Sequence, residues 1–190
     1  MRADLAPLVG ADPDSDPWVR TQLATDTALA VITQGRSPGA PELVDLADRV
    51  GLETLAELWR GEPPSSLPGA LWALYLLRRW AQSSAEEVTR LWRAGRPYAP
   101  AAEVVAGVAD RLDPGAVAEL TDAILNGAYR GEFDVALERA AAFFRVVAAG
   151  RRETARPGAD GDRERQLAQR NDETADGLSE AAAAWRKNPL

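Results

Sequence analysis

The sequence contains no cysteine and no histidine, and its only lysine is Lys187. The absence of cysteine excludes thiol nucleophiles and disulfide bonds, and the absence of histidine excludes imidazole bases. Zinc and haem sites of the usual kinds also depend on these two residue types. A Schiff-base enzyme or a phosphate-binding loop needs a well-placed lysine, and the only lysine of the chain lies among its last residues. We therefore expect a protein without the common catalytic side chains and favour a non-catalytic function.

Long hydrophobic runs are missing as well. Arg78 and Arg79 interrupt the most hydrophobic stretch, so no run reaches the roughly 18 residues that a bilayer crossing needs. Residues 1–16 carry four aspartates and show neither the basic start nor the apolar centre of a secretion signal. We expect no membrane partner and a cytoplasmic location. The formal net charge of -7 repels phosphate backbones at long range, so nucleic acid is not an expected partner.

Apolar residues account for 46% of the 190 residues, which is enough for one domain with a real core. The stretch 67–82 is apolar on nearly every face, as is typical of a helix in the middle of a bundle. A second apolar stripe follows residues 132–152. The sequence therefore predicts an all-α, single-domain bundle of about seven or eight helices, built around these two segments.

Proline and glycine divide the chain into helices. Asp16-Pro17 and Asp113-Pro114 each place an N-cap acceptor before a first-turn proline, and Ser66 is a cap for the central helix. Glycines follow several apolar stripes and mark helix ends. These signals predict helices at 17–34, 41–50, 53–60, 67–82, 84–94, 101–112, 114–125 and 132–152.

Residues 153–190 differ in composition from the rest of the chain. They are charged, contain glycine and are poor in apolar side chains, so burial cannot offset the entropy of ordering them. We predict an N-terminal arm at 1–15, a helical bundle at 16–152 and a charged C-terminal extension at 153–190. A short terminal helix with Ser179 as its cap ends this extension.

Arginine and aromatic residues alternate along the central helix and the helix after it. Arg90, Arg93 and Arg96 recur at i, i+3 spacing on one helix side, and arginine beside tryptophan is the composition of an interaction hot spot. The alternative is that these arginines pair with acidic residues while the aromatic rings fill the core. The predicted function is a non-catalytic interaction or scaffold protein that binds a protein partner or a second copy. Its predicted partner-binding residues are Arg78, Arg79, Arg90, Trp92, Arg93, Arg96 and Trp185.

Two pairs of acidic residues suggest an alternative, a Mg2+-dependent helical hydrolase. Glu42 and Asp45 have i, i+3 spacing on one predicted helix, and Glu119 and Asp122 repeat it on another. Each pair projects from one helix face, and Mg2+ prefers such oxygen ligands. Acidic residues at this spacing also form ordinary solvated faces, so both interpretations stay open. No cofactor is expected outside this alternative.

Residues 43–61 suggest a third possibility, a helix-turn-helix transcriptional regulator. Ala47 and Gly51 stand where that motif has a small residue and a turn glycine. The second half departs from the motif, because its register buries Glu57 and Arg60 and points acidic side chains at phosphates. An ordinary pair of helices bent at a glycine fits the segment better.

Overall fold

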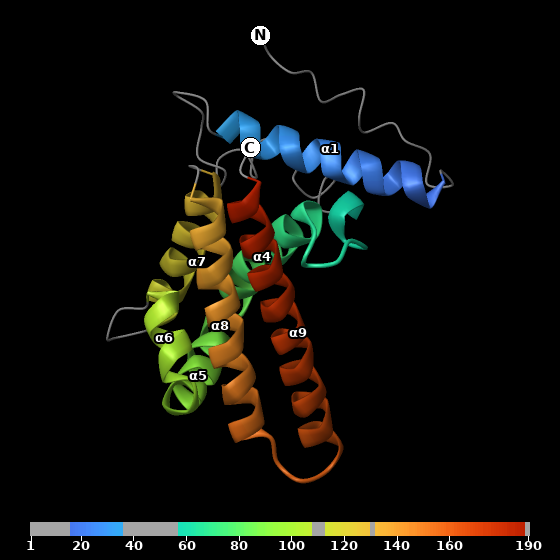
Figure 1. Ribbon diagram of the computed structural model, residues 1–190. Coiled ribbons are helices and arrows are strands. Elements are labelled where there is room, and N and C mark those ends of the chain that lie inside the picture. The colour runs from blue at the N-terminus through green and yellow to red at the C-terminus, as the bar shows by residue number, and fades with distance from the viewer. Residues whose placement is uncertain (1–15, 36–56, 108–112, 130–131, 189–190) are drawn as a thin grey trace.

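The computed structural model describes residues 16–35, 57–107, 113–129 and 132–188. The regular elements in these segments are all helices and none is a strand, which confirms the predicted all-α, single-domain bundle (Figure 1). The predicted arm at 1–15 and the helix predicted at 41–50 lie outside the described residues. Among the described residues, no helix has both the length and the apolar character that a membrane span requires. The helices are α1 (Pro17–Gly35), α4 (Leu67–Ser83), α5 (Ala85–Gly95), η2 (Arg96–Tyr98), α6 (Pro100–Ala106), α7 (Pro114–Tyr129), α8 (Phe133–Thr154) and α9 (Ala159–Lys187).

Local capping chemistry sets the starts of α4 and α7, as the serine and aspartate signals predict. The hydroxyl of Ser66 accepts a hydrogen bond from the backbone N–H of Gly69 at the start of α4, at 3.2 Å. At the start of α7, the Asp113 carboxylate accepts one from Ala116 at 2.8 Å. These acceptors satisfy backbone donors that have no partner inside the first helical turn. α6 ends earlier than predicted because Gly107 adopts a left-handed conformation, with φ of 71°.

Helix α8 occupies the centre of the bundle and contacts α4, α5, α6, α7 and α9 (Figure 1). Its buried residues lie on all sides of the helix and include Phe133, Leu137 and Phe143. The prediction that residues 67–82 lie in the middle of the bundle is therefore corrected. Helix α4 is the second core helix, and it leaves Leu76 42% exposed. A helix with one open face borders the core rather than crossing its middle.

Two glycines allow α5 and α8 to cross at backbone contact. A Cβ atom built on Gly95 would lie 1.8 Å from the carbonyl oxygen of Val146. A Cβ atom on Gly150 would lie 1.9 Å from the carbonyl oxygen of Leu91. Both distances are far below van der Waals contact, so any larger residue would force the two helices apart.

The C-terminal segment differs from the predicted extension with a short terminal helix. Residues 159–187 form α9, a single helix of 29 residues that packs beside α8 (Figure 1). Its buried positions include Gly161, Ala168, Ala175 and Ala182, which repeat every seven residues. These small side chains lose almost no rotamer entropy on ordering, so a narrow apolar seam suffices to hold the helix. Ion pairs between α8 and α9 flank the seam: Arg145–Asp176, Arg151–Glu164, Arg152–Asp172, Arg186–Asp134 and Arg186–Glu138.

Candidate functional site

The predicted band of arginine and tryptophan does not form one surface. Trp92 is 1% exposed and packs against Phe143, with ring centroids 4.8 Å apart. It therefore belongs to the core, and its assignment to a partner surface is corrected. Arg90 and Arg93 are exposed. The helical period of α5 explains the split, because it turns the tryptophan toward α8 and the arginines toward solvent.

Arg78 is a second predicted partner-binding residue that the structure buries. It is 8% exposed, and its Nε atom lies 2.7 Å from Oδ1 of Asp122. A buried guanidinium needs a paired carboxylate, so this contact ties α4 to α7 as a structural ion pair. Arg78 is thereby removed from any partner surface.

The paired-carboxylate prediction places Asp122 in this same contact. Its partner at i-3, Glu119, is exposed, and Glu42 and Asp45 lie outside the described residues. Across the described ranges, no group of three or more acidic side chains converges in a way that could hold a metal ion. The carboxylate of Asp122 is committed to the guanidinium of Arg78, which competes with metal coordination.

The other predicted partner residues also make contacts within the chain. Arg79 donates a hydrogen bond to the hydroxyl of Tyr75 at 3.1 Å. Trp185 packs edge to face on Phe133, with centroids 4.7 Å apart, and so anchors the end of α9 to the start of α8. Arg96 keeps 45% of its side chain exposed while pairing with Glu103 of α6.

The segment that resembles half of a helix-turn-helix is described only from residue 57. Trp59 is buried, and its indole N–H donates to the hydroxyl of Thr27 at 3.0 Å. Glu57 and Arg60 keep about 70% of their side chains exposed, at 72% and 68%. The helix-turn-helix register would bury both residues, so the described part of the segment does not follow it.

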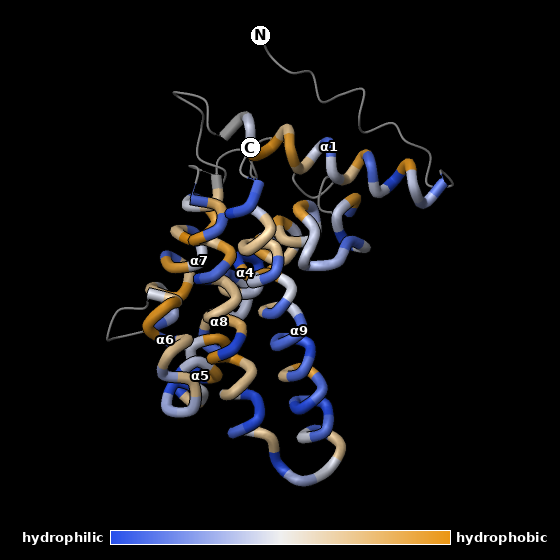
Figure 2. Tube along the Cα trace, in the orientation of Figure 1, coloured by the Kyte–Doolittle hydropathy of each residue, from blue (hydrophilic) through white to orange (hydrophobic). Residues whose placement is uncertain are grey.

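An apolar surface on η2 and α6 was missed by the sequence prediction. Val104 is 80% exposed, Tyr98 63% and Val105 50%. Ala102 and Ala106 are the residues that α6 turns toward the bundle, and the two valines lie on its open side. We name Tyr98, Ala101, Val104 and Val105 the α6 face; the apolar character of α6 is visible in Figure 2.

A shallow hollow of about 480 Å³ adjoins the α6 face. Its lining includes Tyr98, Ala101, Ala102, Val105, Glu138 and Arg145. Both charged residues at its edge have partners on α9, because Arg145 pairs with Asp176 at 3.0 Å and Glu138 accepts from Ser179 at 3.2 Å. The hollow therefore presents mainly apolar surface, and its charges are already compensated.

Tyr98 is the titratable group of the α6 face. A hydrogen bond with the carboxylate of Glu153, together with the negative charge of that carboxylate, raises the pKa of Tyr98. The phenol thus stays protonated over the physiological range. The face carries no charge from this residue at neutral pH.

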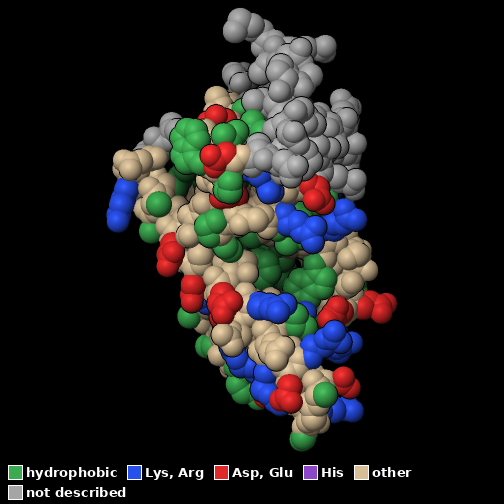
Figure 3. Space-filling view, turned by 90° about the vertical axis from the view of Figure 1, so that its right-hand side faces the viewer, with side chains coloured by type: hydrophobic (Ala, Val, Ile, Leu, Met, Phe, Trp, Pro, Cys, Tyr) green, Lys and Arg blue, Asp and Glu red, His purple; other side chains and the backbone are tan. Residues whose placement is uncertain are grey.

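A second hollow, also of about 480 Å³, opens on another side of the molecule. We name it the α4–α9 pocket, because these two helices flank it above α8. Apolar side chains lie deep in this hollow with basic and acidic ones around it (Figure 3). Its apolar lining is Trp72, Ala73, Leu76, Leu77, Trp80 and Phe144.

Comparisons with protein-family models, with curated proteins and with solved structures found no match to this chain.

Proposed function

We propose that this chain is a non-catalytic interaction protein that binds a protein partner, or a second copy of itself, through the α6 face. The observation that carries the proposal is the exposure of Tyr98, Val104 and Val105, three large apolar side chains that lie within eight residues. Isolated apolar residues are common on protein surfaces, whereas a contiguous apolar patch marks a place where another molecule binds. Arg96, a predicted partner-binding residue, borders this face and remains 45% exposed.

The chemistry of the face supports an apolar partner surface. The hollow beside it has room for one or two apolar side chains, and Tyr98 offers the kind of rigid aromatic ring that is enriched in interaction hot spots. Glu138 and Arg145 are already paired with residues of α9. A partner would therefore gain little from charge and most from burying its own apolar side chains.

The test compares two matched substitutions at exposed apolar positions, Val104→Lys on the α6 face and Leu76→Lys on α4. Lysine near the end of α6 suits the helix dipole, and both positions are at least 42% exposed, so both variants should fold. Quantitative affinity capture from native lysate, with sedimentation analysis of the purified chains, gives the readout.

We expect Val104→Lys to lose a partner, or to dissociate a dimer, while Leu76→Lys behaves like the unsubstituted chain. Equal recovery of the same proteins by all three chains, together with an equal sedimenting mass, would rule out the α6 face as the interface.

A further inference from the structure

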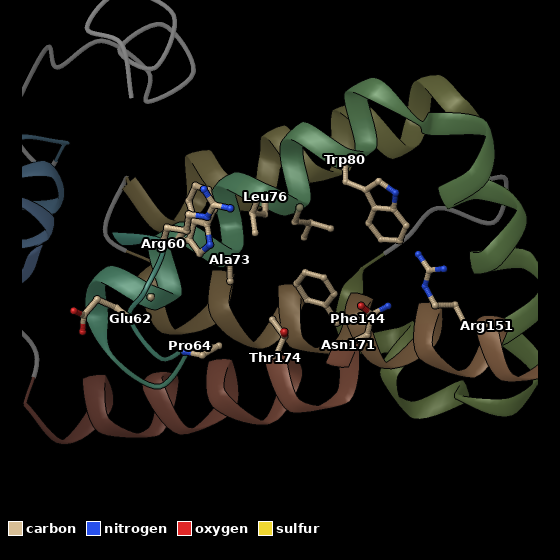
Figure 4. A pocket seen from close by; sticks show the side chains of 13 residues that line it. Arg60, Glu62, Pro64, Ala73, Leu76, Trp80, Phe144, Arg151, Asn171 and Thr174 are labelled. Atoms are coloured by element: carbon tan, nitrogen blue, oxygen red, sulfur yellow. The ribbon is translucent and has the colours of Figure 1, made fainter. Parts of the chain in front are cut away.

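Side chains border the α4–α9 pocket at both ends. At one end, Pro64 lies so near α9 that a Cβ atom on Gly177 would come within 2.8 Å of its side chain. At the other end, the guanidinium of Arg151 lies over the ring of Trp80, 5.2 Å from its centroid. Figure 4 shows the two ends, with Phe144 between them. A partner helix needs an open groove, so this shape suits a compact molecule.

Arg151 brings a buried positive charge to the pocket, and two carboxylates already compensate it. Its side chain is 8% exposed, and Nη1 lies 2.7 Å from Glu164 while Nη2 lies 3.7 Å from Glu87. One cation therefore faces two anions. The third nitrogen, Nε, has no hydrogen-bond partner among the described residues.

Asn171 of α9 supplies a second unpaired donor. Its Nδ2 atom is buried and makes no hydrogen bond within the described part of the chain. Arg151 and Asn171 both line the pocket, and Figure 4 places both toward its Trp80 end. Buried donors are almost always paired in folded proteins, so two unpaired donors beside one hollow indicate an acceptor that comes from outside the described residues.

We propose that the α4–α9 pocket binds a small uncharged molecule with an apolar, preferably aromatic, body and one acceptor oxygen. The body lies against Trp72, Trp80 and Phe144, and the oxygen, from an amide, ketone or ester, accepts from Asn171 Nδ2 and Arg151 Nε. Both nitrogens are closed to solvent, so the ligand oxygen reaches them only after the Asn171 amide rotates and the side chain of Arg151 shifts. The site goes beyond the interaction proposed for the α6 face and does not depend on it.

Charge decides against an ionic ligand. A carboxylate would add a third negative charge beside Glu87 and Glu164, which share one guanidinium. An ammonium group has no lone pair with which to accept from the two N–H donors, so it would leave both of them unpaired. An uncharged acceptor satisfies both donors without either cost.

The test uses four probes of nearly equal shape: benzamide, benzoate, benzylammonium and toluene. Binding to the full chain is followed by NMR, through the indole N–H of Trp80 and the side-chain amide of Asn171. We expect benzamide to bind at least about fivefold more tightly than each of the other three, the difference that one net hydrogen bond makes.

Two variants provide matched controls inside the pocket. Asn171→Ala should abolish the preference for benzamide over toluene, because it removes an unpaired donor. Thr174→Ala should preserve that preference, because the Thr174 hydroxyl already donates to the backbone of Arg170 at 2.9 Å.

The outcomes are distinct from those of the α6 test. Equal affinity for benzamide and toluene would overturn the acceptor site. Absence of binding by all four probes would overturn the pocket as a ligand site. Val104→Lys should bind benzamide normally even if it loses a protein partner.

Discussion

Replacing Gly150 by alanine tests the account of how α5 and α8 pack. In an unstrained helix, alanine is about 1 kcal/mol more favourable than glycine, so the local effect alone would stabilise the protein. The structure predicts the opposite, because the new Cβ atom would lie 1.9 Å from the carbonyl oxygen of Leu91. An ordinary carbon–oxygen contact is about 3.3 Å, so the helices would have to separate by more than about 1 Å.

The expected cost follows from that separation. Overpacking in a close-packed core costs about 1–3 kcal/mol, and a clash of backbone against Cβ, which no rotamer change can relieve, belongs at the upper end. After the gain of about 1 kcal/mol in helix propensity, we expect Gly150→Ala to lower the free energy of unfolding by about 2 kcal/mol. Urea unfolding followed by tryptophan fluorescence measures this quantity.

Gly127→Ala is the matched control. It lies inside α7, and the nearest atom to its Cβ would be Ala136 Cβ at 4.0 Å, an ordinary contact. This variant should gain about 0.5–1 kcal/mol. If Gly150→Ala is as stable as the unsubstituted chain, or if both variants shift in the same direction, the close crossing of α5 and α8 is wrong.

Three further predictions follow from individual contacts. Arg78→Met should lower the free energy of unfolding by about 2 kcal/mol, because it leaves the half-buried carboxylate of Asp122 without its ion-pair partner. Adding Asp122→Leu to this variant should restore most of the lost free energy in the same denaturation assay. Glu153→Gln should lower the pKa of Tyr98 in an absorbance titration of the phenols. Since the raised pKa favours the protonated phenol in the folded state, the stabilisation by this contact is present below about pH 10 and is lost as pH rises through the folded-state pKa. An unchanged titration curve would count against the contact. A chain that ends at Ala155 should show a clearly lower Tm by circular dichroism, because it uncovers the side of α8 that α9 buries, whereas an equal Tm would mean that α9 is dispensable.

The helices of the core could be predicted because their signals are local. Asp113 caps the start of α7 and Ser66 caps the start of α4, through hydrogen bonds that involve only neighbouring residues. The seam of α9 was harder to see, since alanine and glycine carry little hydropathy. Its signal is the heptad spacing from Gly161 to Ala182, which a search for small residues at a period of seven would detect.

The candidate site was predicted less well, because exposure depends on what packs over a helix. Val104 and Val105 share helical spacing with Val108 and Leu112 in the sequence, as in a core stripe, and only the placement of α6 against α8 shows which side of the helix stays open. Trp92 illustrates the reverse error. Its position two residues after Arg90 places it on the opposite side of α5 from that arginine, so helical periodicity separates these two residues.

Site-specific photocrosslinking tests the central claim, that the α6 face binds another protein molecule, most directly. A photoreactive amino acid would replace Val104 in one variant and Leu76 in a control variant. Cells that express either variant would then be irradiated. The account predicts a covalent adduct of defined higher mass from position 104 and none from position 76. Adducts of equal yield at both positions, or no adduct at position 104, would contradict it.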